Sequence, residues 1–453
     1  MAMTVPKEFF SPKSVAVIGA SRTKGKVGHE VLKNFVQKFK GKIACVNPKA
    51  KSILGKACYP SIRNVSGKVD LAVITTSAAV VPQVLRDCVA KKVPAVILIT
   101  SGFGELGDEG QHREQDLKKI ISGSKTRVIG PNCMGIMSGA VDTIFNPAEK
   151  QKRPGKGGIA FLSQSGAVGS TIIDWLAEEG IGISKFISYG NQMDIDESDL
   201  IDALKKDKDT KVITLYLEGV KDGKKFLSNA KATTKSKPII AIKAGKTSAG
   251  QKAVMSHTGA LAGAAEIYSG AFKQAGVIEV QTWEELFDAA IAFGTQPLPK
   301  GNRLAIVTDG GGFGVLATDQ AEKLGIELPA PPENPARIFK QRFPEYVSTK
   351  NPIDLTGDAD AERYRISIEE CLKSNAYDGV IAITLFQLPS LDPKVVDIMI
   401  QLNKKYKKPL LVCATGSSYS QKLMKKLEAN GIPVYPTPER AVTAFASLYK
   451  FKR

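Results

Sequence analysis

The feature that most constrains the fold is a pattern that occurs three times along the chain. Each time, a run of β-branched and other apolar residues leads into a glycine-rich turn, and a helical pattern follows. The three runs are Val15-Ala-Val-Ile-Gly19-Ala-Ser, Ile159-Ala-Phe-Leu-Ser-Gln-Ser165-Gly166 and Leu304-Ala-Ile-Val-Thr-Asp309-Gly-Gly-Gly312. A buried strand, a tight turn and a helix form the first step of a doubly wound parallel sheet. The repeat therefore predicts three doubly wound α/β domains with parallel sheets.

Two further, weaker sequence patterns recur in the same way and help to divide the chain into domains. A proline opens an apolar strand late in each third of the sequence, at Pro94, Pro238 and Pro409, and proline is tolerated at the first residue of a strand. Strand-like runs near 276–280 and 431–434 each precede a helix that a threonine can cap. The pattern stops at the proline-containing stretches 147–158 and 296–301. We expect domains at residues 1–148, 155–296 and 301–453, each alternating strand and helix.

Composition narrows the class of protein. The chain is 43% hydrophobic and 24% charged, which is the balance of a globular protein. No apolar run approaches the roughly 18 residues of a membrane span, and the N-terminus has no apolar segment typical of a secretion signal. We expect a cytoplasmic protein without membrane contact. The six cysteines include no C-x-x-C pair and no histidine at ligand spacing, so neither a disulfide framework nor a structural zinc site is indicated.

The net charge of +18 leaves several anionic partners possible: nucleic acid, a small molecule or an acidic subunit. The basic residues are spread along the chain, and the densest tract, 404–408, is typical of a solvated helix end. Basic and aromatic residues do not interleave, which argues against nucleic-acid binding. Abundant lysine with three histidines also fits the surface of a thermophilic protein.

The first glycine-rich turn, residues 19–28, joins a strand to a helix, and its free backbone amides favour a phosphate. Its spacing differs from G-x-G-x-x-G, and an NAD site would need an acid about 20 residues further on. The chain has Asn47-Pro48-Lys49 after the second strand instead. A lysine in place of the acid favours a phosphorylated ribose, as in NADP or coenzyme A. A tight turn without a ligand is the alternative.

The other strands predicted for this domain end in small polar residues. Because the carboxyl ends of parallel strands line one crevice, these residues are suited to hold a nucleotide and its pantetheine arm. The positions that we assign to the cofactor are Gly19, Ala20, Ser21, Lys26, Val46, Pro48, Lys49, Thr75, Thr76, Ser77, Thr100, Ser101, Gly102, Asn132 and Cys133.

The turn of the second domain, Ser163 to Gly169, also follows a strand and starts a helix. A chain order of Ser165, Asp196 and His257 would suit a hydrolase triad. The nucleophile-elbow pattern fails, however, because neither Ser163 nor Ser165 has glycine two residues before and two after it. Anion binding at the helix N-terminus is the better interpretation. The third domain has a similar turn at 308–314.

The three histidines differ in their surroundings. His29 lies inside the first predicted helix and His112 in a polar helical stretch, so we expect both at the surface. His257 lies in residues 246–263, a stretch of small residues that we expect to form a flexible loop between a strand and a helix. Alone it would be a plain loop histidine. Because the same chain contains two helix N-termini predicted to bind anions, His257 becomes a candidate to carry a phosphoryl group.

Together, the histidine stretch Ser256-His257-Thr258-Gly259-Ala-Leu-Ala-Gly263, the turn Ser163-Gln164-Ser165-Gly166 and the turn Gly19-Ala-Ser21 carry a resemblance that covers essentially the whole chain. The sequence resembles the nucleoside-diphosphate-forming acyl-CoA synthetases, and in particular the alpha subunits of ADP-forming acetyl-CoA synthetases, which are relatives of succinyl-CoA synthetase. The resemblance implies a Rossmann-like CoA-binding domain followed by two flavodoxin-like ligase domains. The third domain resembles one that succinyl-CoA synthetase carries on its beta chain, which departs from the simplest alpha pattern.

The resemblance also implies an acetate–CoA ligase reaction, in which acyl-CoA, ADP and phosphate are interconverted with free acid, CoA and ATP. An acyl phosphate forms first, His257 takes the phosphoryl group, and Glu218 matches the position of the glutamate that holds the imidazole. Imidazole suits this role because it is nucleophilic near neutral pH. The positions implied for phosphate and acyl group are Ser163, Gln164, Ser165, Gly166, Ala167 and Gly259. No metal ligand is implied on this chain.

The chain lacks a Walker lysine and a recognisable nucleotide-grasp domain. The resemblance therefore implies an ATP-grasp beta subunit that binds ADP or ATP with Mg²⁺, most simply in an α2β2 heterotetramer. Two other functions remain open: an NADP-dependent oxidoreductase, and a CoA-sensing regulatory protein built on the same domains. Neither needs His257. The sequence leaves open whether the acid is acetate, branched-chain or aromatic, and in which direction the reaction runs.

Overall fold

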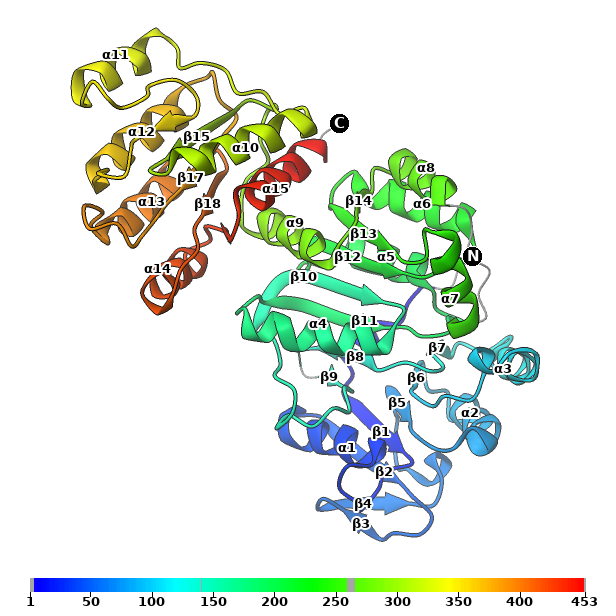
Figure 1. The fold of residues 1–453 in the computed structure, drawn as a ribbon. Helices are drawn as coiled ribbons and strands as arrows, with labels where there is room; N and C mark the ends of the chain where they lie inside the picture. Colours follow the sequence, from blue (N-terminus) through cyan, green and yellow to red (C-terminus); the bar gives the residue numbers. More distant parts are fainter. Residues whose placement is uncertain (1–3, 140, 259–264, 452–453) are drawn as a thin grey trace. The chain divides into compact units, whose positions relative to one another are not determined.

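The computed structural model describes residues 4–139, 141–258 and 265–451. The chain forms two compact units, Met1–Glu279 and Val280–Arg453. The N-terminal unit contains two sheets of seven strands each, and the C-terminal unit contains one sheet of five. Helices flank all three sheets, in which most neighbouring strands are parallel (Figure 1). The predicted α/β class with three doubly wound sheets is confirmed.

The first sheet has the order β3-β4-β2-β1-β5-β6-β7. Its central strand β1 is buried along its whole length and apolar after Ser14, as expected for a parallel strand covered on both faces. The strands are β1 Ser14–Ile18, β2 Lys42–Val46, β3 Ser52–Ile53, β4 Lys56–Tyr59, β5 Leu71–Ile74, β6 Ala95–Leu98 and β7 Arg127–Ile129. The helices are α1 Val27–Lys38, α2 Val81–Ala90 and α3 Asp108–Ile121, with short 3-10 turns η1 Lys7–Phe9, η2 Ile62–Asn64, η3 Ala78–Val80 and η4 Gly104–Leu106.

The second sheet has the order β14-β13-β12-β10-β11-β8-β9. Its strands are β8 Gly135–Ser138, β9 Val141–Asp142, β10 Lys156–Ser163, β11 Ile183–Ser188, β12 Val212–Leu217, β13 Ile239–Lys243 and β14 Ile278–Val280. Its helices are α4 Gly166–Glu178, α5 Glu197–Lys205, α6 Gly223–Thr234, α7 Ser248–Thr258 and α8 Ala265–Ala275. Strand β8 follows the first sheet in the chain but pairs antiparallel with β11 of the second. One apolar core contains residues of both sheets, including Val17 and Leu162, so the two sheets form one body.

The third sheet makes up the core of the C-terminal unit and has the parallel order β16-β15-β17-β18-β19. Its strands are β15 Leu304–Thr308, β16 Ile353–Asp354, β17 Gly379–Ile383, β18 Leu410–Cys413 and β19 Val434–Tyr435. Its helices are α9 Trp283–Thr295, α10 Gly311–Leu324, α11 Glu333–Arg342, α12 Ala361–Lys373, α13 Lys394–Lys405, α14 Ser418–Ala429 and α15 Pro438–Lys450. Helix α9 packs against α15, where Arg440 Nε donates to the Asp288 carboxylate at 2.6 Å.

Several local predictions are confirmed. Pro94, Pro238 and Pro409 directly precede β6, β13 and β18. The side chains of Thr282 and Thr437 cap α9 and α15 by accepting hydrogen bonds from backbone amides of the first helical turn. In the part of the chain that the structure describes, no helix is long and apolar enough to cross a membrane.

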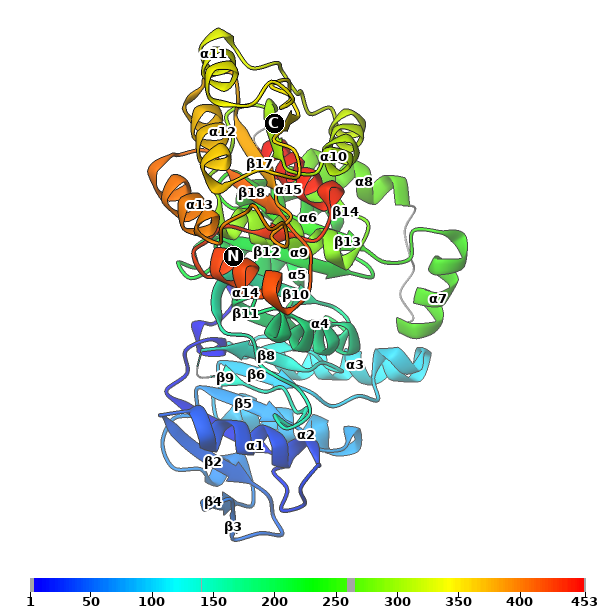
Figure 2. The same cartoon turned by 60° about the vertical axis from the view of Figure 1, so that its left-hand side comes forward.

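The three sheets share one topological feature that fixes where a ligand can bind. In each, the first parallel strand along the chain lies between the strand that follows it and a later one: β1 lies between β2 and β5, β10 between β11 and β12, and β15 between β16 and β17. Ligands of such sheets bind outside the carboxyl ends of the strands, where the connections leave in opposite directions. These switch points lie between β1 and β5, between β10 and β12, and between β15 and β17 (Figures 1 and 2). All three repeated glycine-rich turns therefore lie at switch points.

Candidate functional site

A cavity of about 1280 Å³ lies in the N-terminal unit and connects strand ends of its two sheets. Both switch points of that unit contribute to its wall. The predicted site residues that line it are Thr75, Thr76, Thr100, Ser101, Gly102, Asn132 and Cys133 from the first sheet, and Gln164, Ser165, Gly166, Ala167 and Glu218 from the second. The structure thus brings the positions assigned to the cofactor and those assigned to phosphate into one site.

The switch point of the first sheet requires glycine. Gly19 has φ +89°, and a Cβ added there would lie 2.9 Å from Thr75 Oγ1. A Cβ on Gly28, in the first turn of α1, would lie 2.1 Å from the Gly19 carbonyl oxygen. The Thr75 hydroxyl donates to the Ile18 carbonyl at 3.0 Å, which ties the end of β5 to the end of β1. The turn is therefore held close to the cavity wall, with the N-terminus of α1 behind it.

The remaining residues assigned to the cofactor do not line this cavity. They are Gly19, Ala20, Ser21, Lys26, Val46, Pro48, Lys49 and Ser77. Asn47 Nδ2 donates to the Ala20 carbonyl at 2.8 Å, so the loop after β2 lies against the turn after β1. Lys26, Pro48 and Lys49 are exposed beside that contact. Lys26 and Lys49 thus add two exposed cations to the loops that follow β1 and β2.

One prediction about this region is wrong. His29 is not a surface residue but is buried in the first turn of α1, with 9% of its surface exposed. Its Nδ1 lies 3.0 Å from the Ser21 carbonyl oxygen, so the His29 side chain contacts the backbone of the turn after β1. The helix covers the turn, and its second, third and fourth residues face inward. His112 is exposed on α3 as predicted.

Hydrogen bonds also link the neighbouring strand ends of the first sheet. The Thr100 hydroxyl donates to the Thr76 carbonyl at 2.7 Å, and the backbone N–H of Asn132 donates to the Thr100 carbonyl at 2.9 Å. Burial raises the pKa of the Cys133 thiol to about 12. A thiol with this pKa stays protonated near neutral pH. Cys133 is therefore a packed part of the wall and not a nucleophile.

The switch point of the second sheet has the geometry of an anion site. Ser165 caps α4, its Oγ accepting from the Val168 amide at 3.3 Å, while the Ser163 hydroxyl donates to the Ser165 carbonyl at 2.6 Å. Gly166 and Ala167 follow at the start of the helix and line the cavity. The first amides of a helix have no intrahelical acceptor, and the helix dipole favours a negative charge there. A phosphoryl group fits this position.

The hydrolase alternative does not fit these contacts. Asp196 caps α5 in a capping box with Asp199, and its carboxylate also accepts from Lys225 Nζ at 2.9 Å. Ser165 is occupied as the cap of α4. Both side chains therefore have structural roles that a catalytic triad would interrupt.

Gln164 joins the two sides of this second switch point. Its Oε1 accepts hydrogen bonds from the backbone amides of Glu218 at 2.6 Å and Gly219 at 3.1 Å. Because backbone amides only donate, these contacts assign the oxygen of the side-chain amide. Glu218 directly follows β12, is 5% exposed and lines the cavity. The candidate glutamate is thus fixed next to the Ser165 turn.

His257 lies near the C-terminal end of α7, so the prediction of a flexible loop over 246–263 is wrong for Ser248–Thr258. The stretch contains alanine, glutamine, lysine and methionine, which favour a helix. Helix α7 contacts η4, and Gly104, Glu105 and Leu106 of η4 line the cavity. The candidate position Gly259 lies outside the described residues.

Sequence reasoning missed a polar cluster in the same cavity, formed by Glu105, Glu114, Asn191 and Lys221. Asn191 Nδ2 donates to Glu105 at 2.6 Å and to Glu114 at 3.2 Å. Lys221 Nζ lies 3.8 Å from Glu114. Glu114 lies in the polar helix α3 and is buried, and a buried carboxylate there gives no local signal in the sequence. Among the described residues, no group of three histidine, cysteine, aspartate or glutamate side chains is arranged to hold a metal ion.

Comparisons with known proteins agree with this arrangement. Three family models match consecutive parts of the chain. They are a CoA binding domain at residues 13–139, a succinyl-CoA ligase like flavodoxin domain at 156–293, and a ligase-CoA domain at 304–453. The cavity is lined by residues of the first two.

The chain is 42% identical to the alpha subunit of acetate–CoA ligase (ADP-forming) I from Pyrococcus furiosus, over 98% of this chain and 97% of that protein. It is 42% identical to the acetate–CoA ligase (ADP-forming) of Methanocaldococcus jannaschii, over 97% of this chain but 62% of that protein. The dinucleotide-forming acetyl-coenzyme A synthetase 1 of Ca. Korarchaeum cryptofilum, solved with phosphate and ADP, superposes with a TM-score of 0.92 at 37% identity, covering 99% of this chain and 97% of that one. The chain therefore belongs to the family of ADP-forming acetate–CoA ligases and corresponds over its length to their alpha subunit.

Proposed function

We propose that this chain is the alpha subunit of an ADP-forming acyl-CoA synthetase, with acetate as the first acid to test. The observation that carries the proposal is the single cavity that connects the switch point of the CoA-binding domain with the anion-binding start of α4. A reaction between a CoA thioester and phosphate needs both sites within reach of each other. We also propose the division into domains at 1–148, 155–296 and 301–453.

Coenzyme A fits the first half of the site. The exposed Lys26 and Lys49 lie beside the turn after β1, where they would meet the phosphates of the nucleotide. The hydroxyl and amide groups of Thr75, Thr100 and Asn132 would then accompany the pantetheine arm through the cavity. Gly102, with φ +105°, lets the backbone approach this arm without a side chain. The thioester would reach the start of α4.

The start of α4 supports the chemistry of acyl transfer. Phosphate held by the amides at 166–167 would attack the thioester carbonyl; the new C–O bond forms as the C–S bond breaks, which gives an acyl phosphate and the CoA thiolate. The imidazole of His257 would next attack the phosphorus and release the acid as a carboxylate. Fixed amide donors stabilise the charge on phosphoryl oxygens without reorganising during the reaction.

Glu218 would act on the histidine and not on the substrate. A carboxylate that accepts a hydrogen bond from the N–H of one ring nitrogen leaves the other nitrogen as the nucleophile and fixes the orientation of the ring. Gln164 holds the backbone of Glu218 and Gly219 and so positions this carboxylate next to the phosphate turn. Helix α7, which carries residue 257 near its C-terminal end, contacts η4 of the cavity wall, and this contact supports the assignment.

The site for ADP and Mg²⁺ is proposed to lie on a partner. The chain spans only 62% of the single-chain relative from Methanocaldococcus jannaschii, and we propose that a separate ATP-grasp beta subunit supplies the rest. An α2β2 heterotetramer is the simplest assembly of two such chains. Because the nucleotide lies on another subunit, the phosphohistidine would have to move, and we propose that the residues around His257 allow that movement.

We expect the purified chain alone to bind CoA but to form no ATP from acetyl-CoA, phosphate and ADP. The reconstituted complex with its beta subunit should form ATP at rates typical of metabolic enzymes, roughly 1 to 1000 per second. A coupled ATP assay and calorimetry with CoA measure both. Full ATP formation by the isolated chain would show a nucleotide site on it. CoA binding without any turnover of the complex would favour the CoA-sensing regulator.

We expect CoA to bind more tightly than dephospho-CoA, because Lys49 would pair with the ribose 3′-phosphate. One charge-assisted contact contributes about 1.5–3 kcal/mol, which corresponds to an affinity difference of roughly tenfold or more. Lys49→Ala should reduce this preference, whereas Lys119→Ala, an exposed lysine of α3 paired with Asp116, should not. Calorimetry with CoA, dephospho-CoA and NADP tests the assignment. Equal affinity for CoA and dephospho-CoA, or tighter binding of NADP, would contradict it.

A further inference from the structure

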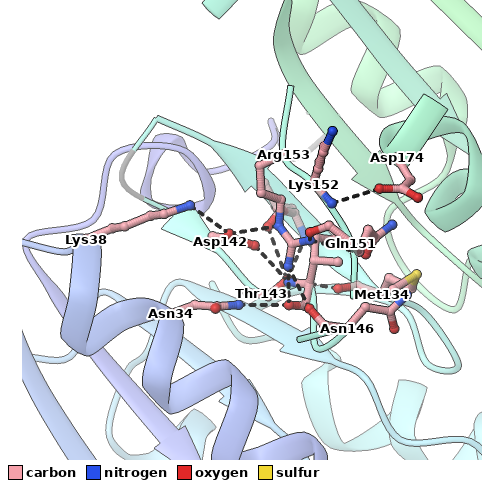
Figure 3. Close-up of polar contacts among 12 residues, drawn as sticks. Asn34, Lys38, Met134, Asp142, Thr143, Asn146, Gln151, Lys152, Arg153 and Asp174 are labelled. Atoms are coloured by element: carbon pink, nitrogen blue, oxygen red, sulfur yellow. Dashed lines mark hydrogen bonds and ion pairs between the residues drawn. The ribbon is translucent and has the colours of Figure 1, made fainter. Parts of the chain in front are cut away.

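A segment that follows β9, residues 143–153, lies between one helix of each sheet of the N-terminal unit (Figure 3). On one side, Asn34 Nδ2 of α1 donates to the Ile144 carbonyl at 2.8 Å. On the other side, Asn146 Nδ2 donates to Ser170 Oγ of α4 at 2.6 Å, and the Lys152 amide donates to Asp174 of α4 at 2.7 Å. The segment is therefore anchored to α1 and to α4.

Arg153 holds the middle of this segment in place. Its side chain is 11% exposed, and its Nε pairs with the Asp142 carboxylate at 3.2 Å. It also donates to the Ile144 carbonyl at 3.1 Å and to the Asn146 carbonyl at 2.9 Å, and it reaches both the backbone and the side-chain oxygen of Gln151 (Figure 3). The two carbonyls at 144 and 146 flank Phe145. A planar group with five fixed donors thus determines the backbone on both sides of Phe145.

Phe145 and Asn146 line the cavity, together with the apolar residues Val27 and Met134. Met134 reaches the start of α4, since a Cβ on Gly166 would lie 3.2 Å from Met134 Cγ. Ser170, which binds Asn146, lies four residues after Gly166 on the same helix. Four residues advance a helix by about 6 Å. The wall around Phe145 therefore lies about one helical turn from the proposed phosphate position.

We propose that Phe145 determines which acids the enzyme accepts and that Arg153 is a positioning residue that holds it. This inference rests on the proposed function. The thioester carbonyl must meet phosphate at the start of α4, and the CoA arm leaves toward the strand ends of the first sheet. The hydrocarbon part of the acid then meets the apolar wall of Phe145, Met134 and Val27. The ring of Phe145 limits this space, so the chain prefers short acids.

The test uses the complex with its beta subunit and measures kcat and KM for acetate, butyrate, hexanoate and phenylacetate in the direction of CoA ester formation. Discrimination by one methylene group amounts to about 10- to 200-fold in a fitted pocket. Phe145→Ala should raise the hexanoate-to-acetate ratio of kcat/KM at least about tenfold, mainly through KM for the acid. Leu106→Ala, which removes an apolar side chain elsewhere in the cavity, should leave this ratio unchanged.

Two results would overturn the assignment of Phe145. One is an unchanged ratio for Phe145→Ala; the other is a rise in KM for CoA without a change in acid preference, which would place Phe145 against the pantetheine arm. Failure of the proposed function is distinguishable from both, because the unaltered complex would then show no acid-dependent turnover at all.

Arg153→Lys tests the positioning role, since lysine keeps the charge beside Asp142 but lacks the planar fork that reaches both carbonyls. We expect this variant to relax acid preference in the same direction as Phe145→Ala while CoA affinity is retained. A loss of stability alone would lower kcat for all acids by one factor and leave their ratio unchanged. That uniform loss would overturn the role of Arg153.

Discussion

Replacing His257 with asparagine is expected to abolish both phosphorylation of this chain and ATP formation by the complex. The asparagine amide keeps a hydrogen-bonding group of similar size but has no nucleophilic nitrogen, so the covalent intermediate cannot form. Because that intermediate is obligatory in the proposed reaction, we expect activity to fall by at least about a thousandfold. Incubation with labelled ATP and Mg²⁺ should give the unaltered complex an acid-labile, alkali-stable label on this chain and the variant none.

Two further variants separate chemistry from folding. His112→Asn changes an exposed histidine of α3 and should label and turn over normally. Glu218→Gln removes the negative charge beside the proposed imidazole, and it should slow labelling strongly while leaving CoA binding intact, because Glu218 lies at the second switch point and not the first. If His257→Asn still takes up label and forms ATP, the phosphohistidine step is wrong.

The parts of the fold that sequence predicts are those that depend on local pattern. The interior strands β1, β10 and β15 each contain a continuous apolar run because both faces of a parallel strand are covered. The glycine-rich turns after these strands are also visible in the sequence, because a side chain at Gly19 or Gly28 would collide with neighbouring atoms. Once the first parallel strand is known to lie between two later ones, the small polar residues that end neighbouring strands are expected to share one crevice. This is why the sequence predicts that Thr75, Asn132 and Ser165 lie at one crevice, and all three line the same cavity.

The parts that sequence does not predict depend on contacts between distant segments. Strand β8 has four residues, and nothing in its own sequence indicates that it pairs with β11 instead of the first sheet. Asn191 meets Glu105 and Glu114 only because this crossing joins the two sheets into one body. The burial of His29 likewise depends on how α1 covers the turn at Ser21. Residue type alone indicates a surface position for such side chains.

The same dependence on tertiary contacts gives one residue of the second sheet a strong effect on stability. Glu197 starts α5 and has 0% of its surface exposed. Its Oε2 has no hydrogen-bond partner among the described residues. Burial, together with the charge of the neighbouring Asp196, raises the pKa of Glu197 to about 8. At neutral pH the folded protein therefore holds this carboxyl group largely protonated.

This shift makes the folded state sensitive to alkaline pH. In the unfolded chain Glu197 loses its proton near the ordinary value of 4.5, whereas in the folded chain it keeps it up to about pH 8. Between these values the unfolded state binds fewer protons, so the free energy of unfolding falls as pH rises. The contribution is fully present below pH 4.5 and is lost as the pH rises through 8. At about 1.4 kcal/mol per pKa unit, the interval corresponds to at most about 5 kcal/mol.

Glu197→Gln should remove this dependence, because glutamine has a similar shape and no charge to bury. We expect the variant to gain stability relative to the unaltered chain as the pH is raised from 5 to 9, by several kcal/mol at the alkaline end. Urea unfolding followed by the fluorescence of Trp175, on α4 of the same sheet, measures this in a Trp283→Phe background. Glu179→Gln, an exposed residue that follows α4, should change stability by less than about 0.5 kcal/mol at every pH. An equal stability difference at pH 5 and pH 9 would show that Glu197 is not held protonated in the folded chain.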